Sequence, residues 1–305
     1  MSTPAHLTTA DPASRANLQR SPGPAKNAPS GKARRGSVRY HVLMIAAAFT
    51  WFIPILWMLS MALTPNDVLQ QGSTGLFPTH FTVANFTGVF HNGDLGRWFV
   101  NSFVVTVLTT IITVLFSAMA GYAFAKIDFP GRKALFIATL AGLMVPKEAM
   151  FIPLFLMISG AHLQNSYPAL ILPRLAAPLG VFIMTQFFSK VPAEVEEAAR
   201  VDGAGPWRIF YTIMLPLARP AMASLAIFTF VLTWNDYLWP LVASTKVAWF
   251  TVTTGLASLQ SNFAATTNLG DLMARGLVGS LPLIVVFLIF QRQLIRGITL
   301  GSGEK

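Results

Sequence analysis

The sequence predicts an all-α membrane protein with six transmembrane helices. Charged residues make up 11% of the 305 residues, against about 25% in soluble domains. Hydrophobic residues make up 53%, and the mean hydropathy is +0.56. Six apolar stretches each approach the ~20 residues that cross a hydrocarbon core as a helix, and none shows the two-residue alternation of a β-barrel strand. This composition excludes a soluble enzyme and a disordered chain.

Residues 1–39 are predicted to form a disordered cytoplasmic tail. They contain no aromatic residue, and they carry seven Lys or Arg against one acid, Asp11. Such a segment buries too little apolar area to offset the entropy lost on ordering it. The basic residues nearest the first span are suited to anchor its inner end at anionic lipid. Residues 40–305 are then expected to form a single transmembrane domain.

Six stretches are expected to span the membrane. The first is uncharged and longer than the apolar part of a signal peptide, so it is expected to be retained. The third is interrupted by Pro146, Lys147 and Glu148, and the fourth contains Arg174. In chain order, the predicted spans are residues 42–63, 99–125, 134–158, 167–188, 220–242 and 272–291.

The distribution of Lys and Arg predicts that both termini are cytoplasmic. With the N-terminus inside, the cytoplasmic segments hold 17 Lys and Arg, whereas the outside segments hold only Arg97 and Lys246. Positive residues concentrate on the cytoplasmic side of membrane proteins. The same bias accounts for the net charge of +10 without a nucleic-acid partner.

The sequence contains no motif for chemistry of its own. It has no cysteine, and its five histidines are scattered without a metal-ligand spacing. A phosphate loop and the common hydrolase motifs are absent. The chain is therefore expected to be no enzyme and to bind no cofactor or metal.

The segment between the fourth and fifth spans, residues 191–216, is predicted to be a cytoplasmic helix–turn–helix. Three acids follow Pro192, as is usual at a helix N-terminus, and Gly203 with Gly205 ends that helix. A second short helix then carries the apolar residues Trp207, Phe210, Ile213 and Leu215. The segment is too apolar for a solvated connector, so it is expected to contact a protein partner. The alternative is an interfacial helix on lipid headgroups.

This segment resembles the EAA loop of the permeases of ABC importers. The pattern is Glu197-Ala198-Ala199, then three residues and Gly203, then nine residues and Ile213, one residue, and Leu215-Pro216. The resemblance extends from residue 42 to the C-terminus. Three further segments resemble the carbohydrate-importer branch, and within it the maltose-type six-span subunit: Ile152-Pro-Leu-Phe155, Gln186-Phe-Phe188 and Trp234-Asn-Asp-Tyr-Leu-Trp-Pro240.

The resemblance implies that this loop is the coupling helix that docks in a cleft of a cytoplasmic ATPase. Glu197 would meet a basic residue there, and Gly203 would allow the turn between the two short helices. ATP and Mg would be bound by that partner and not by this chain. The residues assigned to ATPase coupling are Glu197, Ala198, Ala199, Asp202, Gly203, Ile213, Leu215 and Pro216.

The family resemblance also implies the other partners. A permease of this kind lies in the bilayer of a bacterial or archaeal plasma membrane and pairs with a second, related permease. Two copies of the ATPase dock on the pair, and an extracytoplasmic sugar-binding protein delivers the substrate. The expected function is that of one permease subunit of an ATP-driven sugar importer. Di- or oligosaccharides are the default cargo.

Ionisable and polar groups inside the predicted spans mark a candidate translocation path or gate. At ~1.5 Å of rise per residue, five of them fall in the outer half of the membrane, where such groups usually face a bundle interior or a wet cavity. Two cations there balance two acids. The alternative is a structural ion-pair network. The residues assigned to the path or gate are Lys147, Glu148, Arg174, Asn235, Asp236, Tyr237 and Trp239.

Two further alternatives concern the outside loop and the class of transporter. The polar loop 243–271 carries Trp249, Phe250 and Phe263, and the resemblance implies that it reaches into the binding protein, whereas a plain connector is the alternative. The alternative function is an ion-coupled secondary transporter of a small polar solute, in which the outer-half charges would bind a proton or ion. Against it, the six spans show no inverted repeat. A membrane-embedded enzyme lacks a catalytic constellation.

Overall fold

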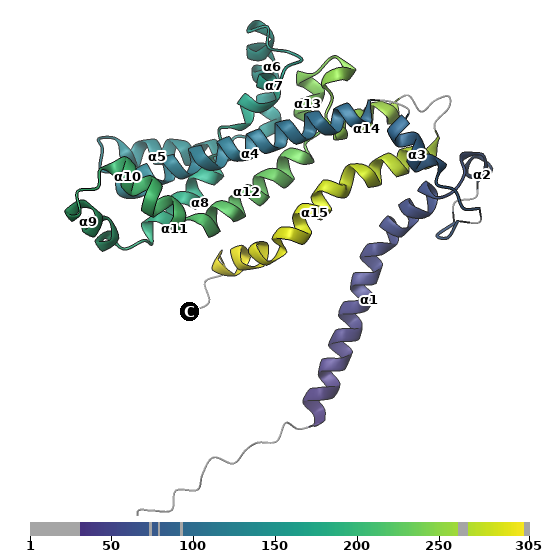
Figure 1. The fold of residues 1–305 in the computed structure, drawn as a ribbon, viewed down its shortest axis with the longest axis horizontal. Helices are drawn as coiled ribbons and strands as arrows, with labels where there is room; N and C mark the ends of the chain where they lie inside the picture. The colour runs from purple at the N-terminus through teal and green to yellow at the C-terminus, as the bar shows by residue number, and fades with distance from the viewer. Residues whose placement is uncertain (1–30, 73–74, 79, 92–93, 262–267, 302–305) are drawn as a thin grey trace, which may run out of the picture. The chain divides into compact units, whose positions relative to one another are not determined.

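The computed structural model describes residues 31–72, 75–78, 80–91, 94–261 and 268–301, and all regular elements in these ranges are helices (Figure 1). They divide into two units, Met1–Ile55 and Leu56–Lys305. In chain order the elements are α1 (Gly31–Ala62), α2 (Asn66–Gln70), α3 (Ala84–His91), α4 (Leu95–Lys126), α5 (Arg132–Ala141), η2 (Gly142–Met144), η3 (Lys147–Met150), α6 (Phe151–Gly160), α7 (Tyr167–Ile171), η4 (Leu172–Arg174), α8 (Pro178–Ser189), α9 (Ala193–Val201), α10 (Pro206–Ile209), the π-helix η5 (Phe210–Met214), α11 (Leu215–Leu217), α12 (Arg219–Trp234), α13 (Leu238–Ala243), η6 (Val247–Trp249), α14 (Val252–Ser261) and α15 (Leu269–Gly301).

The helix α1 begins earlier than the sequence predicts. Residues 31–39, the last part of the predicted disordered tail, are helical, so the tail prediction is wrong for them. Once the apolar span nucleates a helix, each further residue adds a hydrogen bond at little cost, and Ala33, Arg34 and Arg35 are good helix formers. The rest of the predicted tail, residues 1–30, lies outside the described residues.

Among the residues that the structure describes, three helices are long and apolar enough to cross a membrane without interruption. They are Tyr40–Ala62, Leu95–Lys126 and Leu269–Gln291, and they coincide with the predicted first, second and sixth spans. The second, α4, has 32 residues, which corresponds to ~48 Å at 1.5 Å per residue. It is therefore longer than the ~30 Å thickness of a hydrocarbon core.

The predicted third, fourth and fifth spans are broken. Arg132–Met144 and Lys147–Gly160 meet at 97°, and Tyr167–Arg174 and Pro178–Ser189 meet at 49°. Both breaks precede a proline: Val145 is extended before Pro146, and Ala177 has φ −119° before Pro178. Proline disfavours the helical conformation of the residue before it. The chain has six spans only if each bent pair counts as one.

The predicted fifth span, residues 220–242, contains two helices, α12 and α13. The chain leaves the helical path at Asn235 and resumes it at Leu238. The bent pair at this point in the chain joins Pro206–Leu217 to Arg219–Trp234 at 73°, so α12 also turns sharply against the segment that precedes it. Short polar side chains such as those of Asn235 and Asp236 compete for backbone hydrogen bonds and favour such interruptions.

The second unit is organised around α4, which packs along α8 and α12, while α15 packs on α12 and α3 (Figure 1). The α4–α8 contact depends on glycine. A Cβ at Gly121 would lie 2.5 Å from the Met184 Cβ and 2.8 Å from the backbone of the same residue. Small residues allow this close approach of membrane helices, where association is driven by packing.

Replacing Gly121 by alanine is expected to lower the melting temperature of the detergent-solubilised chain. The added methyl group meets backbone that cannot move aside, and overpacking of this kind costs about 1–3 kcal/mol. Gly96→Ala is the matched control in the same helix, because nothing lies within 4 Å of a Cβ there; it is expected to leave the melting temperature unchanged or raise it. Equal melting temperatures for the two variants would contradict the α4–α8 packing.

Candidate functional site

The segment of residues 191–218, called the 191–218 loop below, contains α9 near its start. Gly203 ends this helix. Gly203 has φ +78°. Its N–H donates to the Arg200 carbonyl at 3.0 Å, and the Ala204 N–H donates to the Ala199 carbonyl at 2.9 Å. These two bonds form a Schellman motif, which needs a left-handed residue at the position of Gly203. The chain then reverses into α10 at Gly205 and Pro206.

One side of this loop is packed into the body of the second unit. Six of its hydrophobic residues are buried, and they share a hydrophobic cluster with Tyr122 of α4 and with Met184 and Phe188 of α8. Of the predicted coupling residues, Ala199 is buried, and Ile213, Leu215 and Pro216 are half-buried. The buried hydrophobic residues of the loop are Val191, Ala199, Ile209, Phe210, Met214 and Ala218.

The other side of the loop exposes acidic and large apolar side chains. Glu197, Ala198, Asp202 and Gly203 are all exposed. The three most exposed large hydrophobic side chains of the loop are Val201 at 88%, Trp207 at 64% and Tyr211 at 52%, and of these only Trp207 was predicted from the sequence to contact a partner. The Trp207 and Tyr211 rings stack, with centroids 6.0 Å apart. An apolar group of this kind on a surface indicates a contact with a partner.

Glu196, the neighbour of Glu197, points toward α4 and not toward solvent. In the sequence, Glu196 only marks the N-terminus of a helix. In the structure its side chain is buried, and the residue is 5% exposed. Its Oε1 lies 4.0 Å from the Lys126 Nζ, and its Oε2 lies 3.5 Å from an Arg200 nitrogen. Glu196 shares a helix face with the buried Ala199, because residues three apart lie on one face of a helix.

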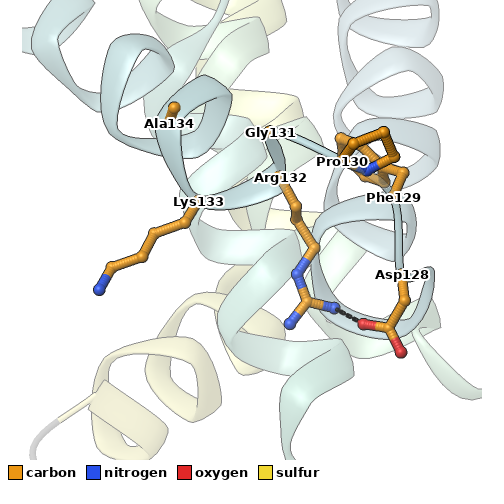
Figure 2. Close-up of a pocket in the computed structure, with 7 residues that line it drawn as sticks. All are labelled: Asp128, Phe129, Pro130, Gly131, Arg132, Lys133 and Ala134. Carbon is orange, nitrogen blue, oxygen red and sulfur yellow. Dashed lines mark hydrogen bonds and ion pairs between the residues drawn. The ribbon is translucent and has the colours of Figure 1, made fainter.

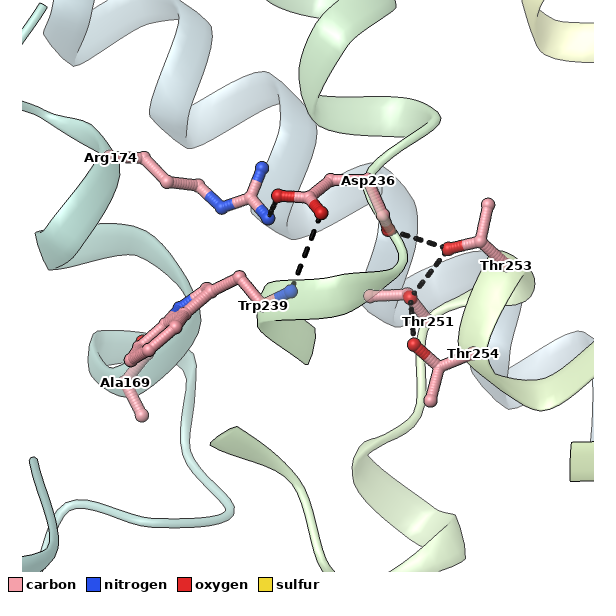
Figure 3. Close-up of polar contacts among 7 residues, drawn as sticks. All are labelled: Ala169, Arg174, Asp236, Trp239, Thr251, Thr253 and Thr254. Atoms are coloured by element: carbon pink, nitrogen blue, oxygen red, sulfur yellow. Dashed lines mark hydrogen bonds and ion pairs between the residues drawn. The ribbon is translucent and has the colours of Figure 1, made fainter. Parts of the chain in front are cut away.

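Two members of the predicted path or gate form an ion pair. Arg174 lies at the end of η4, in the break before α8, and Asp236 lies in the break between α12 and α13. The Arg174 guanidinium donates to the Asp236 carboxylate across these two breaks (Figure 3). The partners are 62 residues apart in the chain. Of the two cations and two acids predicted to balance each other, one cation and one acid are therefore in direct contact.

Other hydrogen bonds hold the same two breaks together (Figure 3). Buried Trp239 donates its indole N–H to the Ala169 carbonyl at 3.0 Å, which joins α13 to α7. The Trp239 backbone N–H donates to the Asp236 carboxylate at 3.4 Å. The Thr253 hydroxyl donates to the Asp236 carbonyl at 2.7 Å, and the Thr251 hydroxyl bridges Thr253 and Thr254. The segment after α13 is therefore tied to the ion pair.

The remaining residues assigned to the path or gate are exposed. Lys147 and Glu148 belong to η3, beside the 97° break, and they form no ion pair with the residues that the structure describes. Asn235 donates to the Val231 carbonyl of its own helix at 2.9 Å. Tyr237 is 37% exposed. The structure thus divides the predicted set into a packed group, Arg174, Asp236 and Trp239, and an exposed group, Lys147, Glu148, Asn235 and Tyr237.

The predicted outside loop is packed over its first part. Asn101 of α4 donates its amide to the Ala248 and Phe250 carbonyls at 2.9 and 3.0 Å. The Ser102 hydroxyl accepts from the Val252 N–H at 2.8 Å, and the helix α14 follows. Residues 248–252 are therefore held against α4 by hydrogen bonds. Phe263 lies outside the described residues.

The turn from α4 to α5 forms a hollow on the surface, lined by residues 128–134 (Figure 2). Arg132 pairs with Asp128 at 2.8 Å, four residues earlier, while Lys133 extends away from them. Within the described ranges, no three His, Asp or Glu side chains gather as a metal site would require. Neither the hollow at residues 128–134 nor the described His, Asp and Glu side chains suggest a catalytic site.

Comparison with known proteins identifies a transport family. The family described as "Binding-protein-dependent transport system inner membrane component" matches residues 113–300. An arabinooligosaccharides transport system permease protein, AraQ, of Halalkalibacterium halodurans is 36% identical over 86% of this chain and 95% of its own length. A diacetylchitobiose uptake system permease protein, NgcG, of Streptomyces coelicolor is 34% identical over 88% of this chain and 89% of its own length.

A solved structure shares the fold. The crystal structure of a bacterial ABC transporter involved in the import of the acidic polysaccharide alginate contains a chain that is similar with a TM-score of 0.77. The two chains are 22% identical, and the match covers 86% of this chain and 97% of that one. At this identity the likeness concerns the arrangement of the helices.

Proposed function

The chain belongs to the binding-protein-dependent transport system inner membrane components, and from this premise we propose that it is one permease subunit of an ATP-driven sugar importer. It is a transport subunit and not an enzyme. The relatives named for arabinooligosaccharides and diacetylchitobiose carry saccharides. Di- or oligosaccharides are therefore the proposed cargo.

The two-sided 191–218 loop is the observation that carries this proposal. One side is packed on α4 and α8. The other exposes Glu197 and the large side chains of Val201, Trp207 and Tyr211. An acid next to an apolar and aromatic surface suits a basic and apolar cleft on a protein partner. In the proposed importer that partner is a cytoplasmic ATPase, and this loop is the coupling helix that docks in it.

The rest of the assembly follows from the same proposal. In this proposal the chain has six spans, the fifth formed by α12 and α13, and the bias of Lys and Arg assigns both termini to the cytoplasm of a bacterial or archaeal cell. A second, related permease completes the translocation path, and an extracytoplasmic binding protein delivers the sugar. ATP and Mg lie on the two ATPase subunits. Their closure pushes the coupling helices of both permeases together and turns the path outward.

The two groups of polar residues take different parts in this function. The packed group, Arg174, Asp236 and Trp239, holds two broken spans together and acts as a gate contact. The exposed group is proposed to contact the cargo, because amide, ammonium and carboxylate groups bind sugar hydroxyls and the Tyr237 ring suits a sugar face. Breaks in the helices are compatible with this placement, since freed backbone groups at membrane depth must line protein or water.

Uptake by reconstituted protein tests the proposal against the ion-coupled alternative. The tagged chain, purified with its natural partners and placed in liposomes, is expected to take up arabinooligosaccharide or diacetylchitobiose only with ATP at the ATPase and with a binding protein present. The chain reconstituted alone is the control and is expected to transport neither sugar. Uptake by the chain alone under a proton or sodium gradient would overturn the importer assignment.

A further inference from the structure

The carboxylate of Glu196 is buried between α9 and the end of α4. Its side chain is 6% exposed, and the side chain of Lys126 is 12% exposed. Tyr122 of α4 packs in the same cluster as Ala199, on the face of α9 that carries Glu196. Arg200 is an exposed neighbour within α9 itself, so Lys126 and Tyr122 are the partners that connect the 191–218 loop to another element. Both belong to α4.

Lys126 and Tyr122 each hold a second part of the same junction. The Lys126 ammonium donates to the main-chain carbonyl of Val191, the residue with which the loop begins. The Tyr122 ring packs edge-on against Phe188 of α8, at 5.7 Å between centroids, and in a tilted arrangement against Phe210 of η5, at 5.2 Å. The cytoplasmic end of α4 is thereby joined to α8, α9 and η5 at one place.

Stability alone does not account for a charged pair at this place. Ala199, Ile209 and Phe210 already pack the loop on α4 and α8. A buried ion pair adds little net stability compared with apolar residues of similar size. Moreover, the Glu196 Oε1 is buried without a hydrogen-bond partner among the described residues, and such groups are rare in a folded protein. What the pair does provide is a fixed position of α9 relative to α4.

We propose that Glu196 and Lys126 form a link that makes α9 and the end of α4 move as one body. This inference rests on the proposed function: the ATPase moves the exposed side of the loop, and the link passes that displacement to α4. Adjacent acids then have separate roles. Glu197 contacts the ATPase, and Glu196, on the opposite face of α9, is a positioning residue that connects this contact to the membrane helices.

Distances between spin labels test this link directly, because the chain has no cysteine of its own. Labels at Glu194→Cys on α9 and Met119→Cys on α4 occupy exposed positions. The distance distribution is measured in the complete co-purified importer, first without nucleotide and then trapped with ATP and vanadate. One body implies the same distribution in both states. In Glu196→Gln and in Lys126→Met, trapping is expected to shift it by about 2 Å or more, the scale of helix displacements in switching proteins.

Two further variants separate the link from a general effect of mutation. Lys190→Met makes the same chemical change at an exposed lysine at the end of α8, and Lys126→Arg keeps the charge of the link. Both are expected to behave as the parent chain. In parallel, Glu196→Gln and Lys126→Met are expected to retain the ATPase and to hydrolyse ATP, while sugar uptake per ATP falls about tenfold, a typical coupling effect.

Several outcomes would overturn the inference. One is a label distance that stays constant in both link variants within an assembled importer. Another is a parent chain in which trapping with vanadate already changes the distance. Loss of the assembled importer in both link variants would show a purely structural role for the pair. By contrast, failure of the parent chain to bring an ATPase with it would count against the proposed function itself.

Discussion

Replacement of Gly203 by valine is expected to abolish recovery of the ATPase with the tagged chain. Gly203 has φ +78° and donates the first bond of the motif that ends α9. The left-handed conformation costs an L-residue about 1–2 kcal/mol, and a β-branched residue is a true outlier there. The turn between α9 and α10 would therefore open. Affinity purification from the native membrane, with the ATPase quantified on a gel, measures the effect.

Two controls distinguish backbone strain from a general effect of mutation. Gly203→Asn is expected to retain most of the ATPase, because asparagine tolerates the left-handed conformation better than other residues. Gly205→Ala changes a nearby glycine that has φ −72° and open space around it, so it is expected to behave as the parent chain. If Gly203→Val recovers as much ATPase as Gly205→Ala does, the turn is not required for docking.

Loss of the Arg174 guanidinium is the second change for which a large effect is expected. Arg174→Met leaves the Asp236 carboxylate without its cation between two broken helices. The pair is partly buried, with side-chain exposures of 14% and 29%, so removing one partner costs less than the ~3–5 kcal/mol of a fully buried pair, and the melting temperature in detergent is expected to fall. Sugar uptake is expected to be lost as well. Thermal unfolding and liposome uptake measure the two effects.

The double variant Arg174→Met with Asp236→Leu separates folding from gating. With both charges removed, no unpaired group remains, and the melting temperature is expected to recover most of its loss. Uptake is expected to stay impaired, because the contact between the two breaks is still absent. Lys147→Met, at an exposed lysine without an ion pair among the described residues, is expected to change the melting temperature little. Full recovery of uptake in the double variant would contradict a gate contact.

Hydropathy correctly predicted the spans that are continuous helices. It did not show where the other spans are broken. The first, second and sixth spans are confirmed as apolar helices, since their length alone meets the requirement. A sum over 20 residues hides a break inside it. The interruption at Pro146 was visible in the sequence because Lys147 and Glu148 follow it, whereas Ala177 before Pro178 lies in an apolar run that continues on both sides.

Contacts between distant segments were beyond what residue spacing can predict. Arg174 and Asp236 were each recognised as charges inside spans, but 62 residues separate them, and only the folded chain shows that the two breaks meet. The same limit applies to Glu196 and Glu197. Adjacent acids on a helix must point in different directions, yet their sequence does not say which of them is packed against α4.

The breaks in the helices have a mechanical consequence. Pro146 and Pro178 have no N–H, so a change of the angle at either place disrupts few helical hydrogen bonds. The continuous helix α4 is stiff by comparison, because bending it would strain a complete ladder of such bonds. Bending of this molecule is therefore expected mainly at the breaks beside Pro146 and Pro178, next to the stiff helix α4. A displacement of one end of α4 therefore moves the whole helix, while the broken helices beside it change their angles.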